Sequence, residues 1–273
     1  MSDIVLSAGV RSNLLNLQQT SDLITTTQTK LATGKRVNSA LDNPTNFFTA
    51  QGLSNRASDL SALLDAMSTG INTIQAANNG LTAITKLVQS AQSLASQALQ
   101  TSDTTVRASL ATQFGAILTQ VDQLAGDSGF NGINLLNGDN LTVVLNEQAP
   151  PNQSSVTVTG VTDTSTGLSI GPAANAWLGN GDITAAQSDL TAALTTLRSQ
   201  AQTLGSSLST VQIRQDFTKS MINTLKTGAD SLTLADTNEE GANLLALQTR
   251  QQLSSTALSL AAQADRNVLR LFG

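Results

Sequence analysis

Apolar residues recur every three or four positions over most of this chain. The most regular run, residues 190–232, covers about six heptads of a/d spacing and is interrupted at Gln215 and Thr218. Shorter runs with the same spacing begin at Val10, Leu60 and Val106. Such spacing is typical of helices packed as a coiled coil, and the core of an intramolecular helical bundle fits it equally well. The chain is therefore predicted to be built from long packed helices.

Proline and capping residues indicate where these helices begin and end. Proline costs about 3 kcal/mol inside a helix, so helices are expected in the long spans without it, 45–149 and 173–273. Asp103 is placed to cap a helix that starts near Thr104, and Gly34 is placed to end the first helix.

Residues 129–181 follow a different pattern. The segment opens with turn-forming residues, and its short β-branched runs at 141–145 and 156–161 are typical of strands. Trp177 has no other aromatic residue near it in the sequence, and we interpret it as a packing anchor. A small β-containing insert is thus expected between two helical arms.

Residues 244–272 carry apolar side chains on several helical faces, so this helix is expected to be buried. Its charges leave no uncharged run of about 18 residues, which argues against a membrane span. The N-terminal helix of the same chain and neighbouring copies are the simplest partners. No cleaved signal peptide is expected, because Met1-Ser2-Asp3 is neither basic nor followed by a long apolar core.

These patterns predict a mainly α fold. A long antiparallel helical bundle or coiled coil would be formed by both chain ends, with a small insert that contains a β-hairpin. The expected parts are terminal helices at 1–44 and 234–273, a second helical domain at 45–128 and 182–233, and the insert at 129–181.

The composition excludes several classes of function. The 273 residues include no His and no Cys, so we expect no enzyme activity, no cofactor and no metal site. Aromatic residues make up 3% and the net charge is −5, which argues against nucleic-acid binding. Only 12% of residues are charged, about half the usual share. Such a surface suits a chain that packs against copies of itself, although disorder is the alternative.

Three regions of the sequence resemble bacterial flagellins. SAGVRSNLLNLQQT (7–20) and LATGKRVNSALDNPTNFF (31–48) resemble the N-terminal signature, and LALQTRQQLSSTALSLAAQADRNVLRLFG (245–273) resembles the C-terminus. GFNGINLLNG (129–138) resembles the turn that ends the flagellin N-terminal helical core. The residues of that turn are Phe130, Asn131 and Gly132. The chain is similar to short α-proteobacterial flagellins, which have little or no variable outer domain.

The resemblance implies a subunit that polymerises with itself into the helical flagellar filament, the propeller of bacterial motility. The terminal helices would pair and line the inner tube, the next helices would form an outer shell, and the insert would face solvent. The apolar residues expected to pack between subunits are Leu14, Leu17, Ile24, Leu31, Leu253, Leu258, Leu260, Val268 and Leu271. A spoke between the two layers would include Asn38, Asp42 and Pro44, and a plain polar turn is the alternative.

The resemblance also implies partners and a location. The chain would pass the flagellar export apparatus without a cleaved signal, meet junction and cap proteins, and reside in the extracellular flagellum. A hook–filament junction protein, which has similar terminal helices, is the alternative. Flagellins bound by the vertebrate innate receptor carry Arg and Glu where this chain has Ser90, Gln92 and Ser93, so binding to that receptor is not expected.

Two sets of polar residues have candidate roles. O-linked glycosylation of related filaments makes Thr157, Thr162, Thr164 and Ser165 candidates, and ordinary strand and turn hydroxyls are the alternative. Rare helical charges, among them Lys30 and Arg56, are candidates for ion pairs between subunits. Solvated surface charges worth at most about 1 kcal/mol are the alternative for these.

Overall fold

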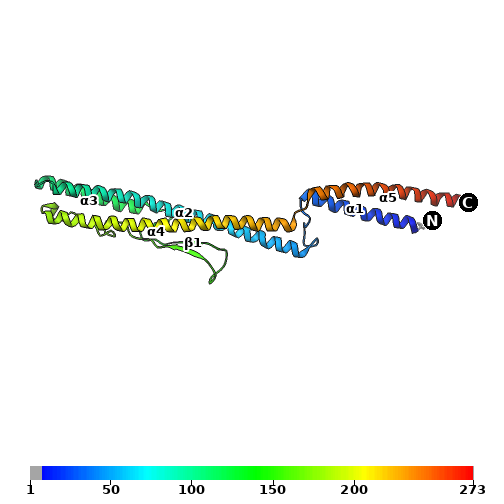
Figure 1. Cartoon of the computed structure of the whole chain (residues 1–273), viewed down its shortest axis with the longest axis horizontal. Helices are drawn as coiled ribbons and strands as arrows, with labels where there is room; N and C mark the ends of the chain where they lie inside the picture. The colour runs from blue at the N-terminus through cyan, green and yellow to red at the C-terminus, as the bar shows by residue number, and fades with distance from the viewer. Residues whose placement is uncertain (1–7, 273) are drawn as a thin grey trace. The chain divides into compact units, whose positions relative to one another are not determined.

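The computed structural model describes residues 8–272, without the side chains of 265 and 268–272. Within these residues the chain forms five long α-helices and one two-stranded sheet (Figure 1). The helices are α1 (Ala8–Thr33), α2 (Pro44–Leu99), α3 (Thr104–Asp127), α4 (Asn180–Thr233) and α5 (Thr237–Phe272). The predicted mainly α fold with a small hairpin-containing insert is confirmed.

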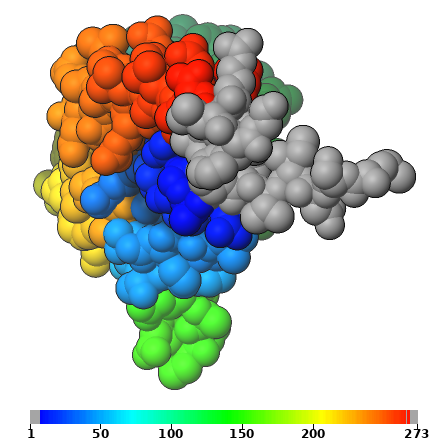
Figure 2. Space-filling view, turned by 90° about the vertical axis from the view of Figure 1, so that its right-hand side faces the viewer, coloured from blue at the N-terminus to red at the C-terminus, as the bar shows by residue number. Residues whose placement is uncertain are grey.

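The chain divides into two compact units. The terminal unit comprises Met1–Asn55 with Thr224–Gly273, and the central unit comprises Arg56–Asn223. In the terminal unit α1 and α5 lie side by side (Figure 2) and run in opposite directions (Figure 1). Where the two helices meet the rest of the unit, Lys35 and Leu234 form an antiparallel bridge. The apolar C-terminal helix therefore has the N-terminal helix as its partner within the chain.

Local signals set the helix ends. Gly34 follows α1 with a φ of +68°, a conformation that glycine adopts without steric cost. Pro44 is the first residue of α2, where its missing N–H costs nothing, and the side chain of Asn43 caps the same turn. Asp103 caps α3 by accepting hydrogen bonds from two backbone amides of its first turn, as predicted.

In the central unit, α2 and α4 run antiparallel. Nε2 of Gln187 donates to Oγ of Ser96 (3.1 Å) and Nε2 of Gln215 donates to Oγ of Ser68 (2.9 Å), so residue numbers fall along α4 as they rise along α2. Gln215, an interruption of the apolar run, thus joins the two helices. The fully buried core residues include Met67, Ile74, Leu81, Ile84, Phe114, Leu190 and Leu197.

The sheet is an antiparallel hairpin of β1 (Leu141–Val144) and β2 (Ser155–Val158). The second strand predicted at 156–161 extends too far, because its last three residues leave the ladder. The backbone amide of Val161 donates instead to the carbonyl of Leu135 (2.8 Å), in the loop before β1. Backbone pairing with that loop ends β2 early.

Trp177 is buried in the insert, consistent with an anchoring role. It closes the short helix η1 (Ala174–Trp177), and its ring centroid lies 4.9 Å from that of Phe114 in α3. The side chains of Trp177 and Phe114 are both fully buried. Although no aromatic residue is near Trp177 in the sequence, the fold provides one.

Candidate functional site

The candidate functional site of this chain is a surface for packing against other molecules. Among residues 8–272, no group of three or more acidic, His or Cys side chains is arranged to hold a metal ion. Nor does any helix in the described part combine the length and apolar character needed to cross a membrane. The terminal unit instead carries large apolar side chains that face solvent.

Most of these exposed side chains are leucines of α1 and α5. In α5, Leu245, Leu253 and Leu260 are 67%, 66% and 61% exposed, and in α1 Leu15 and Leu23 are about half exposed. A helix that presents leucines on faces away from its own partner is typical of a surface covered in an assembly. The helix pair therefore has apolar area left over for other molecules.

The residues predicted to pack between subunits differ in how much of each the chain itself covers. Those that are exposed are Leu14, Leu253 and Leu260, and those that are half-buried are Leu17, Leu31 and Leu258. Ile24 is buried, so it packs within its own chain. Val268 and Leu271 lie in α5, and their side chains are outside the described residues.

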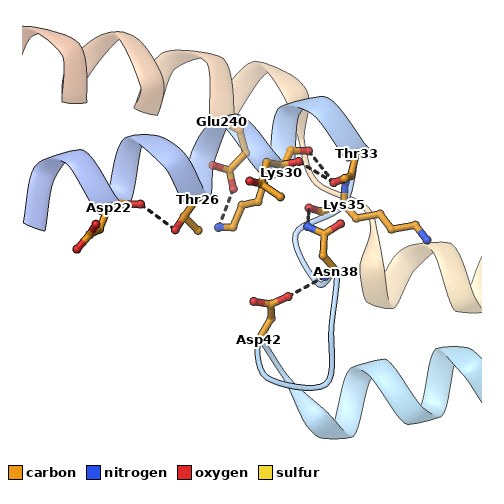
Figure 3. A network of polar contacts seen from close by, with 9 residues as sticks. Asp22, Thr26, Lys30, Thr33, Lys35, Asn38, Asp42 and Glu240 are labelled. Carbon is orange, nitrogen blue, oxygen red and sulfur yellow. Dashed lines mark hydrogen bonds and ion pairs between the residues drawn. The ribbon is translucent and has the colours of Figure 1, made fainter.

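A partly buried ion pair joins α1 to α5. Nζ of Lys30 lies 3.1 Å from Oε1 of Glu240 (Figure 3). Arg56 of α2 forms a second ion pair, with Glu147 of the insert, in the central unit. Both cations therefore have partners in their own chain. Sequence reasoning missed the two glutamates, because no local pattern links residues so far apart.

An open groove runs along the paired helices. It has a volume of about 510 Å³, and its lining includes Leu23 and Lys30 of α1 with Asn243, Leu247 and Arg250 of α5. The lining combines apolar, neutral polar and charged side chains. The groove gives the helix pair a concave surface beside its exposed leucines.

The predicted spoke, residues 38–44, contains a turn closed by one carboxylate. Oδ2 of Asp42 accepts hydrogen bonds from the backbone amides of Asn38 (2.9 Å, Figure 3) and Ser39 (2.8 Å). These backbone hydrogen bonds, with that from Ser39 the strongest cause, lower the pKa of Asp42. The carboxylate is therefore ionised at neutral pH, and the turn leaves Leu41 at its tip 95% exposed.

The predicted Phe-Asn-Gly turn is present just after α3. The backbone N–H groups of Phe130 and Ile133 each donate to the other residue's carbonyl, at 2.9 and 3.0 Å. Asn131 and Gly132 have φ angles of 49° and 80°, the region that Gly and Asn tolerate best. The residue types at these positions therefore match the backbone that the turn requires.

The hydroxyl groups of the insert differ in accessibility. Thr157 and Thr162 are exposed, whereas Thr164 and Ser165 are half-buried. Oγ of Ser165 also donates to Oδ2 of Asp122 in α3 (3.1 Å). Thr157 and Thr162 are the more accessible positions for a modifying enzyme.

Comparison with known proteins places the chain in a family. Residues 8–141 match the bacterial flagellin N-terminal helical region, and residues 188–272 match the bacterial flagellin C-terminal helical region. Flagellin FljK of Caulobacter vibrioides is 30% identical over 283 aligned positions, which cover 100% of this chain and 99% of the relative. A flagellin of Brucella melitensis is 27% identical with the same coverage. A crystal structure of Bacillus cereus flagellin shares 21% identity at a TM-score of 0.47, over 57% of this chain and 88% of that chain.

The match therefore covers both helical ends, and relatives of nearly the same length align from end to end. These full-length relatives are α-proteobacterial flagellins, so the resemblance to the short flagellins of that group is confirmed. The chain belongs to the bacterial flagellin family, and it is a structural subunit of the helical flagellar filament used for motility.

Proposed function

We propose that this flagellin polymerises through the exposed leucines of α1 and α5, which pack against the same helices of neighbouring copies in the filament core. The exposure of Leu245, Leu253 and Leu260, 61–67%, carries the proposal. Burying a leucine stabilises by about 1.5–3 kcal/mol, so a few such contacts per subunit favour assembly. Others assigned to this surface are Leu14, Leu17, Leu31, Leu258, Val268 and Leu271. Head-to-tail contacts that do not close give an open filament.

The turn at 38–44 would act as the spoke between inner and outer layers, and the insert would face solvent. Support for the spoke comes from the hydrogen bonds of Asp42, which hold the turn through contacts between neighbouring residues.

In the insert, Thr157 and Thr162 are the favoured glycosylation sites, ahead of Thr164 and Ser165. An intact filament mass equal to that of the bare chain would contradict modification.

Further partners follow from the family. The subunit would leave the cell through the flagellar export apparatus without a cleaved signal, contact junction and cap proteins, and have no catalytic role. Flagellins align with the full chain, which favours a filament subunit over a hook–filament junction protein.

Uncharged Ser90, Gln92 and Ser93 support the absence of binding to the innate receptor. Full activation of receptor-reporter cells by purified monomer would contradict that proposal.

The test of the assembly surface is Leu253→Gln in the full chain. Glutamine has a helix propensity close to that of leucine, so α5 is preserved while an apolar contact is lost. The critical concentration for polymerisation, measured by sedimentation and electron microscopy, should rise about tenfold or more.

Leu178→Gln is the matched control, because Leu178 is 56% exposed and lies in the central unit. It should polymerise like the parent chain. Normal assembly of Leu253→Gln would show that this part of α5 is not in the filament core.

A further inference from the structure

Leu41 is the most exposed large apolar side chain of the described residues, at 95%. It lies at the tip of the Asp42 turn, and its own backbone amide donates to Oγ of Ser39 (3.3 Å). Single exposed leucines are common and need no explanation. This one differs because the turn that carries it is held by several hydrogen bonds to Asp42 and Ser39. Presenting it to a partner therefore costs little conformational entropy.

The central unit carries an open groove lined by both apolar and polar side chains. Its volume is about 200 Å³, and its lining combines apolar Leu60, Leu145, Phe217 and Met221 with polar and charged Arg56, Asn146, Glu147, Ser154, Arg214 and Thr218. Phe217 is 54% exposed, so the groove opens to solvent on the α4 side. A volume of about 150 Å³ is enough to hold benzene, so the groove has room for a leucine side chain beside its apolar residues.

Charged groups beside Leu41 and beside the groove are also complementary. Arg214 lines the groove and forms no ion pair within the described residues, whereas Arg56 is paired with Glu147. Asp42, next to Leu41, uses Oδ2 for the turn, and Oδ1 accepts no hydrogen bond there. A guanidinium and a carboxylate oxygen are thus both available beside the two apolar surfaces.

We propose that Leu41 of one subunit inserts into this groove of a neighbouring subunit, beside Phe217, with Asp42 facing Arg214. The inference rests on the proposed function, since the occupant is a second copy of this chain. Each subunit offers one leucine in its terminal unit and one groove in its central unit, so the contact joins two different sets of residues, is heterologous and can repeat along a filament. It adds a specific contact outside the terminal helices.

Cysteine cross-linking tests the contact directly, because the chain has no Cys. The variant Leu41→Cys/Ser154→Cys places one thiol on the turn and one in the groove lining, where Ser154 is close to cysteine in size. Mild oxidation of its filaments should give a ladder of disulfide-linked multimers in denaturing gels. The matched control is Leu41→Cys/Ser155→Cys, since Ser155 is exposed and outside the groove lining. It should give at least about tenfold less ladder.

Three results would overturn the proposal: intact filaments of the double variant without a ladder, dimers from Leu41→Cys alone, or a disulfide within one monomer. The first excludes the groove, the second indicates a symmetric contact, and the third places the turn in its own groove. If the parent chain forms no filaments at all, the proposed function fails instead, and the two failures are thereby distinguished.

A second measurement does not depend on disulfide geometry. Leu41→Ala should raise the critical concentration about tenfold, with the circular dichroism of the monomer unchanged because the side chain is exposed. Arg214→Glu, which opposes Asp42, should raise it too, whereas Arg214→Lys should have a smaller effect. An unchanged critical concentration for Leu41→Ala would count against the contact.

Discussion

At the residue scale, Asp163 links stability to pH. Its side chain is fully buried, and neither of its oxygens has a hydrogen-bond partner among the described residues. Burial raises the pKa of Asp163 to about 6 from an ordinary 3.8, and the neighbouring Gln200 side chain opposes the rise. The folded state thus binds a proton more tightly than the unfolded state does, so the free energy of unfolding should fall as pH rises from about 4 to 6.

The Asp163→Asn variant removes this dependence. Because a shift of that size corresponds to about 3 kcal/mol, the variant should be more stable than the parent by roughly that amount at pH 7.5. At pH 4 the two should be nearly equal. Urea unfolding of the monomer at both pH values measures this, with Asp65→Asn as an exposed-carboxylate control. A constant difference between variant and parent across pH would refute the linkage.

Residues such as Asp163 show the limit of sequence reasoning. Asp42, Asp103 and Gly34 act on neighbours within a few positions, so their roles can be read from local patterns. Arg107 cannot be read this way: it is buried, and its guanidinium donates to the carbonyls of Ala98, Thr101 and Leu178 and to Oδ1 of Asn180. Its role depends on where α4 begins in space, and no heptad pattern contains that information.

At the element scale, the packing of the insert on α2 requires glycine. A methyl group added at Gly80 would overlap the side chains of Ser128 and Leu136. Ser128 cannot move away freely, because its hydroxyl donates to the carbonyl of Leu124 (2.6 Å). The end of α3 and the loop after it thus approach α2 at this glycine. The apolar spacing of α2 gives no sign of this requirement.

Gly80→Ala should therefore lower the free energy of unfolding by about 1–3 kcal/mol through overpacking, despite the better helix propensity of alanine. Gly115→Ala in α3 is the matched control, since no atom of the described residues other than its own helix lies within 4 Å of the added methyl. It should raise the free energy of unfolding by up to about 1 kcal/mol. Denaturant unfolding of both monomers measures the difference, and equal effects would refute the close approach.

At the scale of the whole molecule, the two units should differ in local stability before assembly. Isolated helices are marginal in water, and within the described part of the terminal unit α1 and α5 pack mainly against each other while several leucines stay exposed. In the central unit, three helices and the insert share one continuous core.

Hydrogen exchange of the monomer should therefore be faster in α1 and α5 than in α2–α4. Polymerisation should slow exchange in α1 and α5 most, while α3 changes little. Mass spectrometry of peptides from monomer and filament measures both effects. Equal protection of α1 and α3 in the monomer would mean that the terminal unit needs no partner.

The long helices, their capped ends, the small hairpin insert and the flagellin family can all be predicted from the sequence alone. Heptad spacing and helix caps depend on residues a few positions apart, and the family signatures are contiguous segments. Tertiary structure decided which leucines remain exposed, which glutamates neutralise Lys30 and Arg56, and where glycine, Trp177 and Asp163 meet their neighbours. A heptad pattern predicts an apolar stripe on a helix, but it does not indicate which element packs against that stripe. Only the arrangement of the helices in space shows which apolar surface the chain covers itself and which it leaves for another copy.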